Sequence, residues 1–337
     1  MDAKITKKRL GRMLSYDWIK IIAVAAALIF GWVLIFTMTA TRITSAQQFT
    51  VYNYMNNATF TTTGFGNFLD KAEKDGVFSY EILETTTLDL AATPDNATML
   101  LETRIATYEG DVVLVADVGN PMLGYKEDEE TGEKICDYTY TDTFVLNYRY
   151  TLFNLDREDP DGYFKQMENF LIEYYGADWK NAALKNSVVE KKFRARVEDD
   201  KRFKKETQIQ EGLKDEKERI ENYRAALIRF YELLEKGIVS LVSIDAKTDG
   251  VHVQGTYFIN ICPTEATADL VNITGYYSEY YDDATGKKES KLTAENMCVA
   301  FMNIFEDDYD LSEGFQYEDL VFTVYMVDSY LDESKLS

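Results

Sequence analysis

Histidine and cysteine are scarce in this 337-residue chain. There is one histidine, His252, and the three cysteines, Cys136, Cys262 and Cys298, lie far apart without a CxxC spacing. This scarcity excludes most His- or Cys-ligated metal sites, and the sequence also lacks GxSxG, HExxH and P-loop motifs. An odd number of cysteines leaves buried thiols, or one disulfide and one thiol, as the alternatives. We therefore predict a protein that is not an enzyme and that uses neither a metal ion nor another cofactor.

Basic residues are few in relation to acidic ones. Lys plus Arg is 36 against 58 Asp plus Glu, which gives a formal net charge of −22. A nucleic-acid-binding protein needs a basic surface that displaces counterions from phosphates, so this charge argues against a nucleic-acid partner. Proline and glycine are also few, at 4 and 18 residues, whereas 46% of the chain is hydrophobic. The chain is therefore neither disordered nor collagen-like, and its length suits about two domains or one large one.

One long apolar run lies near the N-terminus. Residues Ile21–Met38 are almost uninterrupted hydrophobic side chains, and Trp18 and Ile19 extend the run in front. About 20 residues are enough for one helical crossing of a ~30 Å hydrocarbon layer. Trp18 suits the interfacial aromatic belt, and the long side chain of Lys20 can reach the headgroups. The sequence thus predicts a transmembrane anchor over residues 18–39.

The charges around this run predict its orientation. Residues 1–20 carry six basic and two acidic side chains, a net charge of +4, so the other 317 residues carry −26. By the positive-inside rule, residues 1–17 lie in the cytoplasm and residues 45–337 lie outside a cell membrane that the chain crosses once. A cleaved signal peptide, with cleavage after Ala46, is an alternative, although the apolar core of a signal peptide is shorter. A buried helix of a soluble protein is another.

From residue 45 onward the pattern is that of an α/β domain. Alternating or apolar β-rich segments predict strands, and amphipathic segments between them predict helices. These are strands at 47–55, 78–90 and 111–117 and helices at 67–76 and 97–110. Because strands joined by helices form a parallel sheet with right-handed crossovers, we expect such a sheet here. The five apolar residues between Asp111 and Asp117 are typical of a strand covered on both faces.

The carboxyl ends of these strands hold the candidate ligand-binding residues. They are Asn53 and Tyr54 near the end of the first strand, Asp89 near the end of the second, and Asp117 and Asn120 near the end of the third. In parallel sheets, ligands bind beyond the carboxyl ends of the strands. We therefore predict that Asp117 and Asn120 share a crevice with Asn53 and Tyr54. An ordinary turn with an Asx cap is the structural alternative for Asp117 and Asn120.

Two further polar patterns carry weaker predictions. The Asn- and Thr-rich segment 56–66 leads into a helix N-terminus, which favours carboxylate or phosphate groups. Asp308, Asp310, Ser312 and Asp319 match positions 1, 3, 5 and 12 of a calcium-binding loop. However, Glu313 replaces the required glycine and position 12 is Asp rather than Glu, which favours a solvated acidic turn.

The rest of the chain contains hairpins, a charged helical subdomain and returning strands. We predict hairpin-like pieces at 124–148 and 275–292, strands at 238–246, 251–262 and 295–305, and a helix at 315–331. Residues 160–236 form the helical subdomain. Its longest helix, 207–236, has an apolar stripe with one polar interruption at Glu216. We expect this stripe to pack on the helix at 161–175, with dimerisation through the stripe as the alternative.

Several segments resemble bacterial extracytoplasmic solute-binding proteins of the type II periplasmic-binding class. The resemblance lies in QQFTVYNY, FSYEILE and ETRIATYEGDVVLVAD within residues 47–117. TYFINIC looks like the strand that returns through the second lobe, and FQYEDLVFTVYMVDSYL looks like the closing helix. The resemblance implies a periplasmic-binding-like ectodomain whose two lobes close on a small-molecule solute. It also implies an ABC transporter permease as the partner that receives the solute.

The sequence departs from that family in two ways. The anchor is a transmembrane segment instead of a lipidated cysteine, and residues 150–236 do not align with a second lobe. An alternative function is therefore a non-enzymatic accessory or sensor domain of the cell envelope, with the same fold but without a working ligand cleft. A cleft filled by side chains of the long helix would favour this alternative.

Overall fold

The computed structural model describes most of the chain in two compact units, Met1–Thr44 and Ser45–Ser337. The described residues are 7–39, 43–54, 62–90, 96–127, 132, 134–248, 250–264, 268–282, 285–304 and 317–331. The described part of the first unit contains one helix, α1 (Lys7–Thr39). Its stretch Trp18–Thr37 is 20 residues long with a mean hydropathy of 2.6, and Trp32 is 72% exposed. At ~1.5 Å per residue this stretch spans roughly 30 Å, which suits a membrane anchor or a signal sequence.

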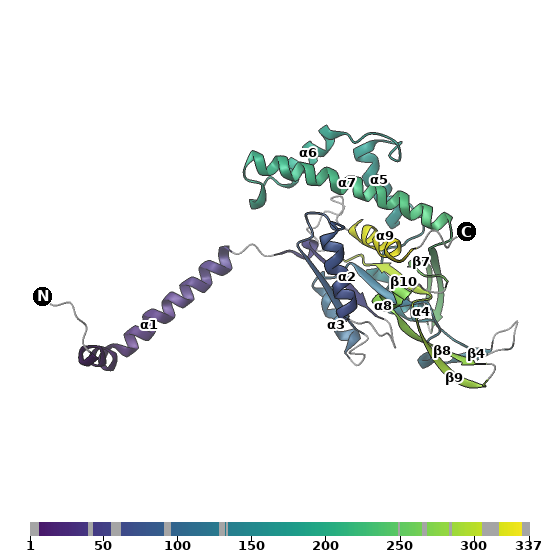
Figure 1. Ribbon diagram of the computed structural model, residues 1–337, viewed down its shortest axis with the longest axis horizontal. Helices are drawn as coiled ribbons and strands as arrows, with labels where there is room; N and C mark the ends of the chain where they lie inside the picture. Colours follow the sequence, from purple (N-terminus) through teal and green to yellow (C-terminus); the bar gives the residue numbers. More distant parts are fainter. Residues whose placement is uncertain are drawn as a thin grey trace. The chain divides into compact units, whose positions relative to one another are not determined.

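The second unit is built on a six-stranded mixed sheet (Figure 1). The strand order is β2-β1-β3-β10-β7-β6. The strands are β1 (Gln48–Asn53), β2 (Glu84–Asp89), β3 (Val112–Ala116), β6 (Ser240–Thr248), β7 (Val251–Asn260) and β10 (Met297–Phe301). β1 pairs in parallel with β2 and with β3, as the sequence predicts. The prediction of a parallel sheet holds for these three strands only, because β10, β7 and β6 pair in antiparallel fashion.

Helices cover both faces of the sheet. On one face, Phe322 of α9 (Glu318–Tyr330) lies 5.1 Å from Phe49 of β1 and 6.3 Å from Phe65 of α2 (Thr62–Lys74), measured between ring centroids. α8 (Ala268–Thr274) packs beside α2. On the other face, Phe144 of α4 (Tyr140–Tyr148) packs edge-on against Tyr54 at 4.8 Å. α3 (Ala97–Ala106) joins β2 to β3.

Two predicted elements differ from the observed ones. The strand expected at 78–90 is shortened to β2, because the ring of Phe78 packs against Phe49 and Phe322 in the core instead of continuing the ladder. The hairpin expected at 124–148 is confirmed for β4 (Tyr125–Glu127) and β5 (Lys134–Cys136), but its last part is the helix α4. A capping box fixes the start of α4, because Thr139 and Asp142 each accept the other's backbone N–H.

The remaining elements agree in type with the predictions. The helix expected at 67–76 begins earlier, at Thr62. The second hairpin pairs β8 (Tyr276–Asp282) with β9 (Lys287–Thr293). Short 3-10 turns are η1 (Ser45–Gln47), η2 (Pro121–Leu123), η3 (Arg149–Thr151) and η4 (Lys201–Phe203).

A helical layer covers α9 on the side away from the sheet (Figure 1). It consists of α5 (Tyr163–Tyr175), α6 (Asn186–Arg196) and the long α7 (Glu206–Glu235). Phe164 of α5 stacks on Phe230 of α7 with the ring centroids 4.9 Å apart, which confirms the predicted contact between these helices. α9 covers α7 as well, and Leu227 of the apolar stripe has no exposed surface. The stripe is therefore buried within one chain, as the intramolecular prediction requires.

Candidate functional site

The carboxyl ends of β1, β2 and β3 reach the same edge of the sheet. Asn53 is the last residue of β1 and lies opposite Asp89 in the ladder. Its side-chain amide donates to Asp89 Oδ1 at 2.9 Å, and its own surface is fully buried. The backbone N–H of Tyr54 donates to the carbonyl of Leu114 in β3. The predicted topology of these strands is therefore confirmed.

The five candidate residues share an edge but not a face of the sheet. Successive side chains of a strand point to opposite faces. Asn53 shares its face with Phe49, which packs on α9, whereas the ring of Tyr54 packs on α4. Asp117 contacts α4 as well, because the hydroxyl of Thr141 donates to its carboxylate at 2.7 Å. The single crevice predicted for Asn53 and Asp117 is thus divided by the sheet between two faces.

On the α4 face, the candidate residues are held by contacts within the protein. Tyr54 lies in hydrogen-bond contact with Thr98 of α3 and Tyr148 of α4. Burial raises the pKa of the Tyr54 hydroxyl, and it raises that of Tyr148 to about 12. Both hydroxyls are therefore neutral hydrogen-bonding groups at physiological pH.

Asn120 shapes the turn that follows β3. Its side-chain oxygen accepts the backbone N–H of Met122 at 3.1 Å and thereby caps η2. Its amide nitrogen donates to Thr143 of α4 at 3.3 Å, and its side chain is buried. The Asx-capped turn that was the structural alternative for this segment is therefore present.

The three cysteines are free thiols, of which Cys262 and Cys298 are buried and Cys136 is partly exposed. Cys136, Cys262 and Cys298 are all free, which removes the disulfide alternative. Burial raises the pKa of Cys262 to about 12, and burial together with the charge of Asp117 raises that of Cys298 well above its usual value. Thiols in this state are poor nucleophiles and poor metal ligands.

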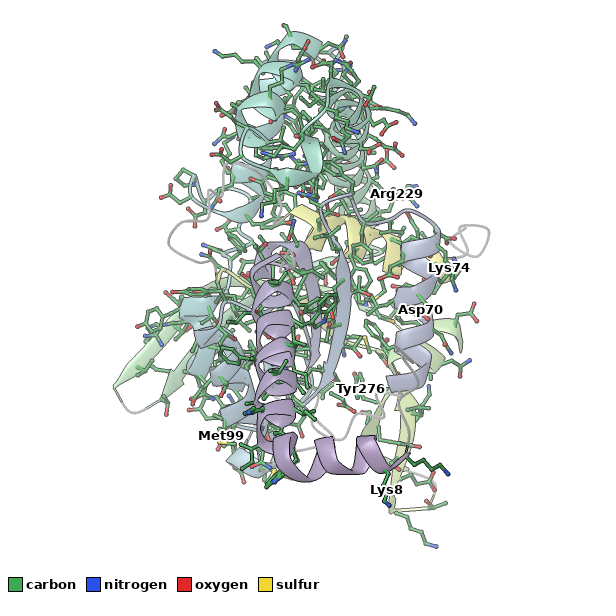
Figure 2. The ribbon with its side chains drawn as sticks, turned by 90° about the vertical axis from the view of Figure 1, so that its left-hand side faces the viewer. Lys8, Asp70, Lys74, Met99, Arg229 and Tyr276 are labelled. Atoms are coloured by element: carbon green, nitrogen blue, oxygen red, sulfur yellow. The ribbon has the colours of Figure 1, made fainter. Side chains whose placement is uncertain are left out.

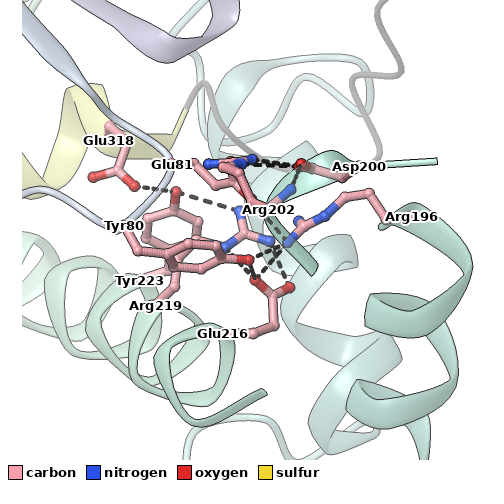
Figure 3. Close-up of polar contacts among 9 residues, drawn as sticks. All are labelled: Tyr80, Glu81, Arg196, Asp200, Arg202, Glu216, Arg219, Tyr223 and Glu318. Atoms are coloured by element: carbon pink, nitrogen blue, oxygen red, sulfur yellow. Dashed lines mark hydrogen bonds and ion pairs between the residues drawn. The ribbon is translucent and has the colours of Figure 1, made fainter. Parts of the chain in front are cut away.

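A second polar cluster, which the sequence did not predict, lies at the amino ends of the parallel strands (Figure 3). We call it the arginine–glutamate network. It joins the turn before β2, the helices α6 and α7, η4 and the start of α9 through Tyr80, Glu81, Arg196, Asp200, Arg202, Glu216, Arg219, Tyr223 and Glu318. The one signal in the sequence was the polar interruption of the apolar stripe at Glu216. The structure accounts for it, because this carboxylate is buried among arginines.

Glu216 is the centre of the network. Arg219, which has no exposed surface on its side chain, donates to both carboxylate oxygens at 2.8 and 2.9 Å. Arg196 and the hydroxyl of Tyr80 donate to Glu216 at 3.0 and 2.9 Å. Burial alone would raise the pKa of Glu216, but the charges of Arg219 and Arg196 outweigh it and hold this pKa below its usual value. The carboxylate is therefore ionised while buried.

The network is extended by two more carboxylates. Glu81 accepts from Arg202 at 2.7 Å and from Arg196 at 3.4 Å. Glu318, in the first turn of α9, accepts from the hydroxyl of Tyr223 at 2.6 Å. Burial raises the pKa of Glu318, and its hydrogen bonds with Ser79 and Tyr223 oppose that rise. These contacts tie the helical layer to both the sheet and α9.

Two acidic side chains beside the network favour the protonated state. Asp111, at the start of β3, accepts the backbone N–H of Thr50 at 2.7 Å, and burial raises its pKa to about 7. Burial and the neighbouring Asp111 and Glu318 raise the pKa of Asp319 well above its usual value. Among the described residues, Asp319 Oδ1 has no hydrogen-bond partner. Burying a carboxyl without a countercharge disfavours its ionised form.

A groove of about 450 Å³ lies between α2, α8 and α9. Phe68 and Tyr325 supply its aromatic surface, and Lys71 in it is bonded to Asp75 and Tyr325. Asp70 and Lys74 project outward from the same helix (Figure 2). The groove is separate from the strand-end residues that the sequence predicts.

Some predicted sites lie outside the described residues. These include the polar loop at 55–61 and three of the calcium-pattern residues, Asp308, Asp310 and Ser312. The fourth, Asp319, is buried in the first turn of α9. Within the described part of the chain, no group of three His, Cys, Asp or Glu side chains is arranged to hold a metal ion.

Comparisons of this chain with protein-family models, with curated proteins and with solved structures find no match. The resemblance to solute-binding proteins therefore stays a prediction from the sequence.

Proposed function

We propose that the protein is a membrane-anchored, non-enzymatic accessory or sensor domain of the cell envelope. The observation that carries this proposal is the state of the strand-end edge. The candidate residues there are divided between two faces of the sheet and bonded to other parts of the same domain. In this function α1 fixes the chain in the membrane, and residues 45–337 lie outside the cytoplasm and act through their surface.

The proposed anchoring rests on α1 and the charges in front of it. The apolar stretch Trp18–Thr37 has the length of one crossing, and the basic residues before it favour the cytoplasmic side. Protease added to intact cells should digest the exposed domain and leave a membrane fragment of about 40 residues. Release of a soluble mature protein into the medium would instead indicate a cleaved signal sequence.

A ligand screen tests the accessory function itself. The full chain, solubilised in detergent, is heated with sugars, amino acids and short peptides, each well above the expected dissociation constant. A solute at about 100 times its dissociation constant stabilises a binding protein by ~2.7 kcal/mol, which gives a clear shift of the unfolding temperature. We expect no such shift. A saturable shift with one solute would overturn the accessory function.

Solute binding with an ABC permease is the second candidate function. It is favoured by the convergence of Tyr54, Asp117 and Thr141 on the α4 face beyond the ends of β1 and β3, where parallel sheets bind ligands. For this function, Asp117→Ala should weaken solute affinity by about tenfold, which corresponds to loss of one charge-assisted hydrogen bond. Asn53→Ala is the matched control, because Asn53 faces the opposite side of the sheet.

A further inference from the structure

One basic surface stands out in the acidic second unit. Residues 185–205 carry nine Lys or Arg against four Asp or Glu, a local net charge of +5. Arg196 and Arg202 belong to the arginine–glutamate network and Arg194 is paired with Glu190 and Glu206. Lys192 is paired with Glu173. We call the other five lysines of this segment, all exposed, the lysine tip.

The lysine tip consists of exposed side chains that make no ion pair with the described residues. Its members are Lys185, Lys191, Lys201, Lys204 and Lys205. Two exposed carboxylates, Glu198 and Asp199, lie between α6 and η4, so the tip keeps an excess of positive charge. An excess of unpaired lysines attracts anionic surfaces over about a Debye length.

The lysine tip lies beside the point where the chain enters the second unit. The carbonyl of Gln47, just before β1, accepts the N–H of Leu83 at 2.8 Å. Two residues earlier in the same turn, Glu81 holds Arg202 of η4 and Arg196 of α6. The basic ends of α6 and η4 are therefore fastened next to the residue that follows the linker.

The linker is short. Residues 40–44 separate the last residue of α1 from η1, and an extended chain of this length reaches at most roughly 20 Å. Gln47 is the eighth residue after Thr39, so when α1 spans a membrane the chain holds Gln47 at most roughly 28 Å from that end of the helix. Arg202 of η4 is bonded to Glu81 in the turn that contacts Gln47, so it can reach the membrane surface as well.

We infer that the lysine tip binds the anionic phospholipid headgroups of the membrane that α1 spans. This inference rests on the proposed membrane anchoring. Each lysine near an anionic bilayer surface gains roughly fivefold in binding constant at low salt. Because the tip is rigidly joined to the sheet by the arginine–glutamate network, its contact with lipid sets the orientation of the whole domain.

Lysine acetylation in nanodiscs tests this inference on the full chain. The protein is inserted into discs of phosphatidylcholine alone or with phosphatidylglycerol, and the acetylation rate of each lysine is measured by mass spectrometry. We expect the lysine tip to react at least about threefold more slowly in the anionic discs at low salt, and equally in both discs at about 0.5 M salt. Lys126, Lys247 and Lys287, which lie elsewhere on the domain, should react equally in both.

A pair of triple variants provides the matched control. Lys191→Gln, Lys201→Gln and Lys204→Gln together should abolish the protection of Lys185 and Lys205. Lys126→Gln, Lys247→Gln and Lys287→Gln remove the same charge and should leave that protection intact.

Two outcomes would overturn the inference. One is equal reactivity of the lysine tip in both kinds of disc while the chain remains inserted. The other is equal protection by inorganic phosphate in the zwitterionic discs, which would indicate a soluble phosphate ligand. Failure of the chain to stay in the discs during an alkaline carbonate wash would instead refute the proposed anchor, so the two failures are distinguishable.

Discussion

Polar groups are buried in different ways at the amino ends and at the carboxyl ends of the parallel strands, which we call the amino edge and the carboxyl edge. At the amino edge, ionised side chains are buried together, with Glu216 in contact with two arginines and Tyr80. At the carboxyl edge, carboxylates accept from uncharged donors instead, as Asp89 does from Asn53 and Asp117 does from Thr141. The contacts at the amino edge join the helical layer to the sheet, whereas those at the carboxyl edge join the strand ends to α4 and to each other.

This difference indicates which substitutions should lower the stability of the domain most. A buried ion that loses its partner is left with an uncompensated charge, which is far more destabilising than loss of a neutral hydrogen bond. We therefore expect substitutions of ionised residues in the arginine–glutamate network to destabilise the domain more than substitutions at the carboxyl edge. The carboxyl edge is the part of the molecule that can vary without loss of the fold.

The largest effect should come from Glu216→Gln. It leaves the fully buried guanidinium of Arg219 without its main countercharge, and we expect a loss of about 3 kcal/mol of unfolding free energy, measured by denaturant titration. Glu190→Gln is the matched control, because Glu190 is an exposed partner of Arg194, which keeps Glu206. A Glu216→Gln variant as stable as the control would show that Glu318 compensates Arg219.

The next effect concerns pH. The carboxyl of Asp111 has a pKa of about 7 in the folded state, against 3.8 in the unfolded chain. The folded state therefore holds this proton more tightly than the unfolded state does. The stability that the protonated Asp111 contributes is present below pH ~4 and is lost as the pH rises to ~7. Asp111→Asn should match the wild type at pH ~4 and exceed it by about 2 kcal/mol at pH ~8, since the partial exposure of Asp111 reduces the full effect.

Denaturant midpoints of both proteins across this pH range give the measurement. Glu318 and Asp319 also titrate nearby, so the difference between variant and wild type is the quantity to follow. A difference that does not change with pH would contradict the shifted pKa of Asp111.

A smaller effect is expected at the carboxyl edge. Asn53→Ala removes a buried hydrogen bond to Asp89 at 2.9 Å and should lower the unfolding free energy by about 1.5 kcal/mol. Gln48→Ala, at the other end of β1, removes an exposed hydrogen bond to Glu84 and should change the midpoint little. Equal losses in the two variants would mean that burial at the carboxyl edge does not matter.

The smallest effect should come from Asp117→Asn. The hydroxyl of Thr141 can still donate to the amide oxygen, so we expect a loss of about 0.5 kcal/mol or less by the same titration. A loss above about 1.5 kcal/mol would show that the charge of Asp117 itself is needed. The carboxyl edge would then depend on a buried charge, as the amino edge does.

The sequence predicts the elements of this fold better than their partners. β1 and β3 follow from short apolar segments, and α7 follows from its 3.6-residue periodicity. β2 is shorter than expected because Phe78 and Tyr80 are drawn to α9 and α7, contacts that are far away in sequence. α4 was not predicted, because its segment is rich in Tyr and Thr, which have high β propensity. The capping box of Thr139 and Asp142 stabilises the start of the helix there.

The candidate site shows the same limit. The edge shared by Asn53 and Asp117 follows from the rule for parallel strands, but the face each side chain takes depends on the register, which the sequence alone does not fix. The arginine–glutamate network could not be predicted, because its partners come from five segments between Tyr80 and Glu318. Only the polar residue in an apolar stripe, Glu216, gave a sign of it.

The position of β10 has a consequence for how the domain is made. This strand is inserted between β3 and β7, so the sheet stays divided until residues 297–301 have left the ribosome. Until then β3, whose five residues are all buried in the finished sheet, is an open apolar edge that can pair with another chain. Long-range pairing of this kind also slows folding. A truncation before residue 297 should therefore aggregate, and a chain being exported would need protection along most of its length.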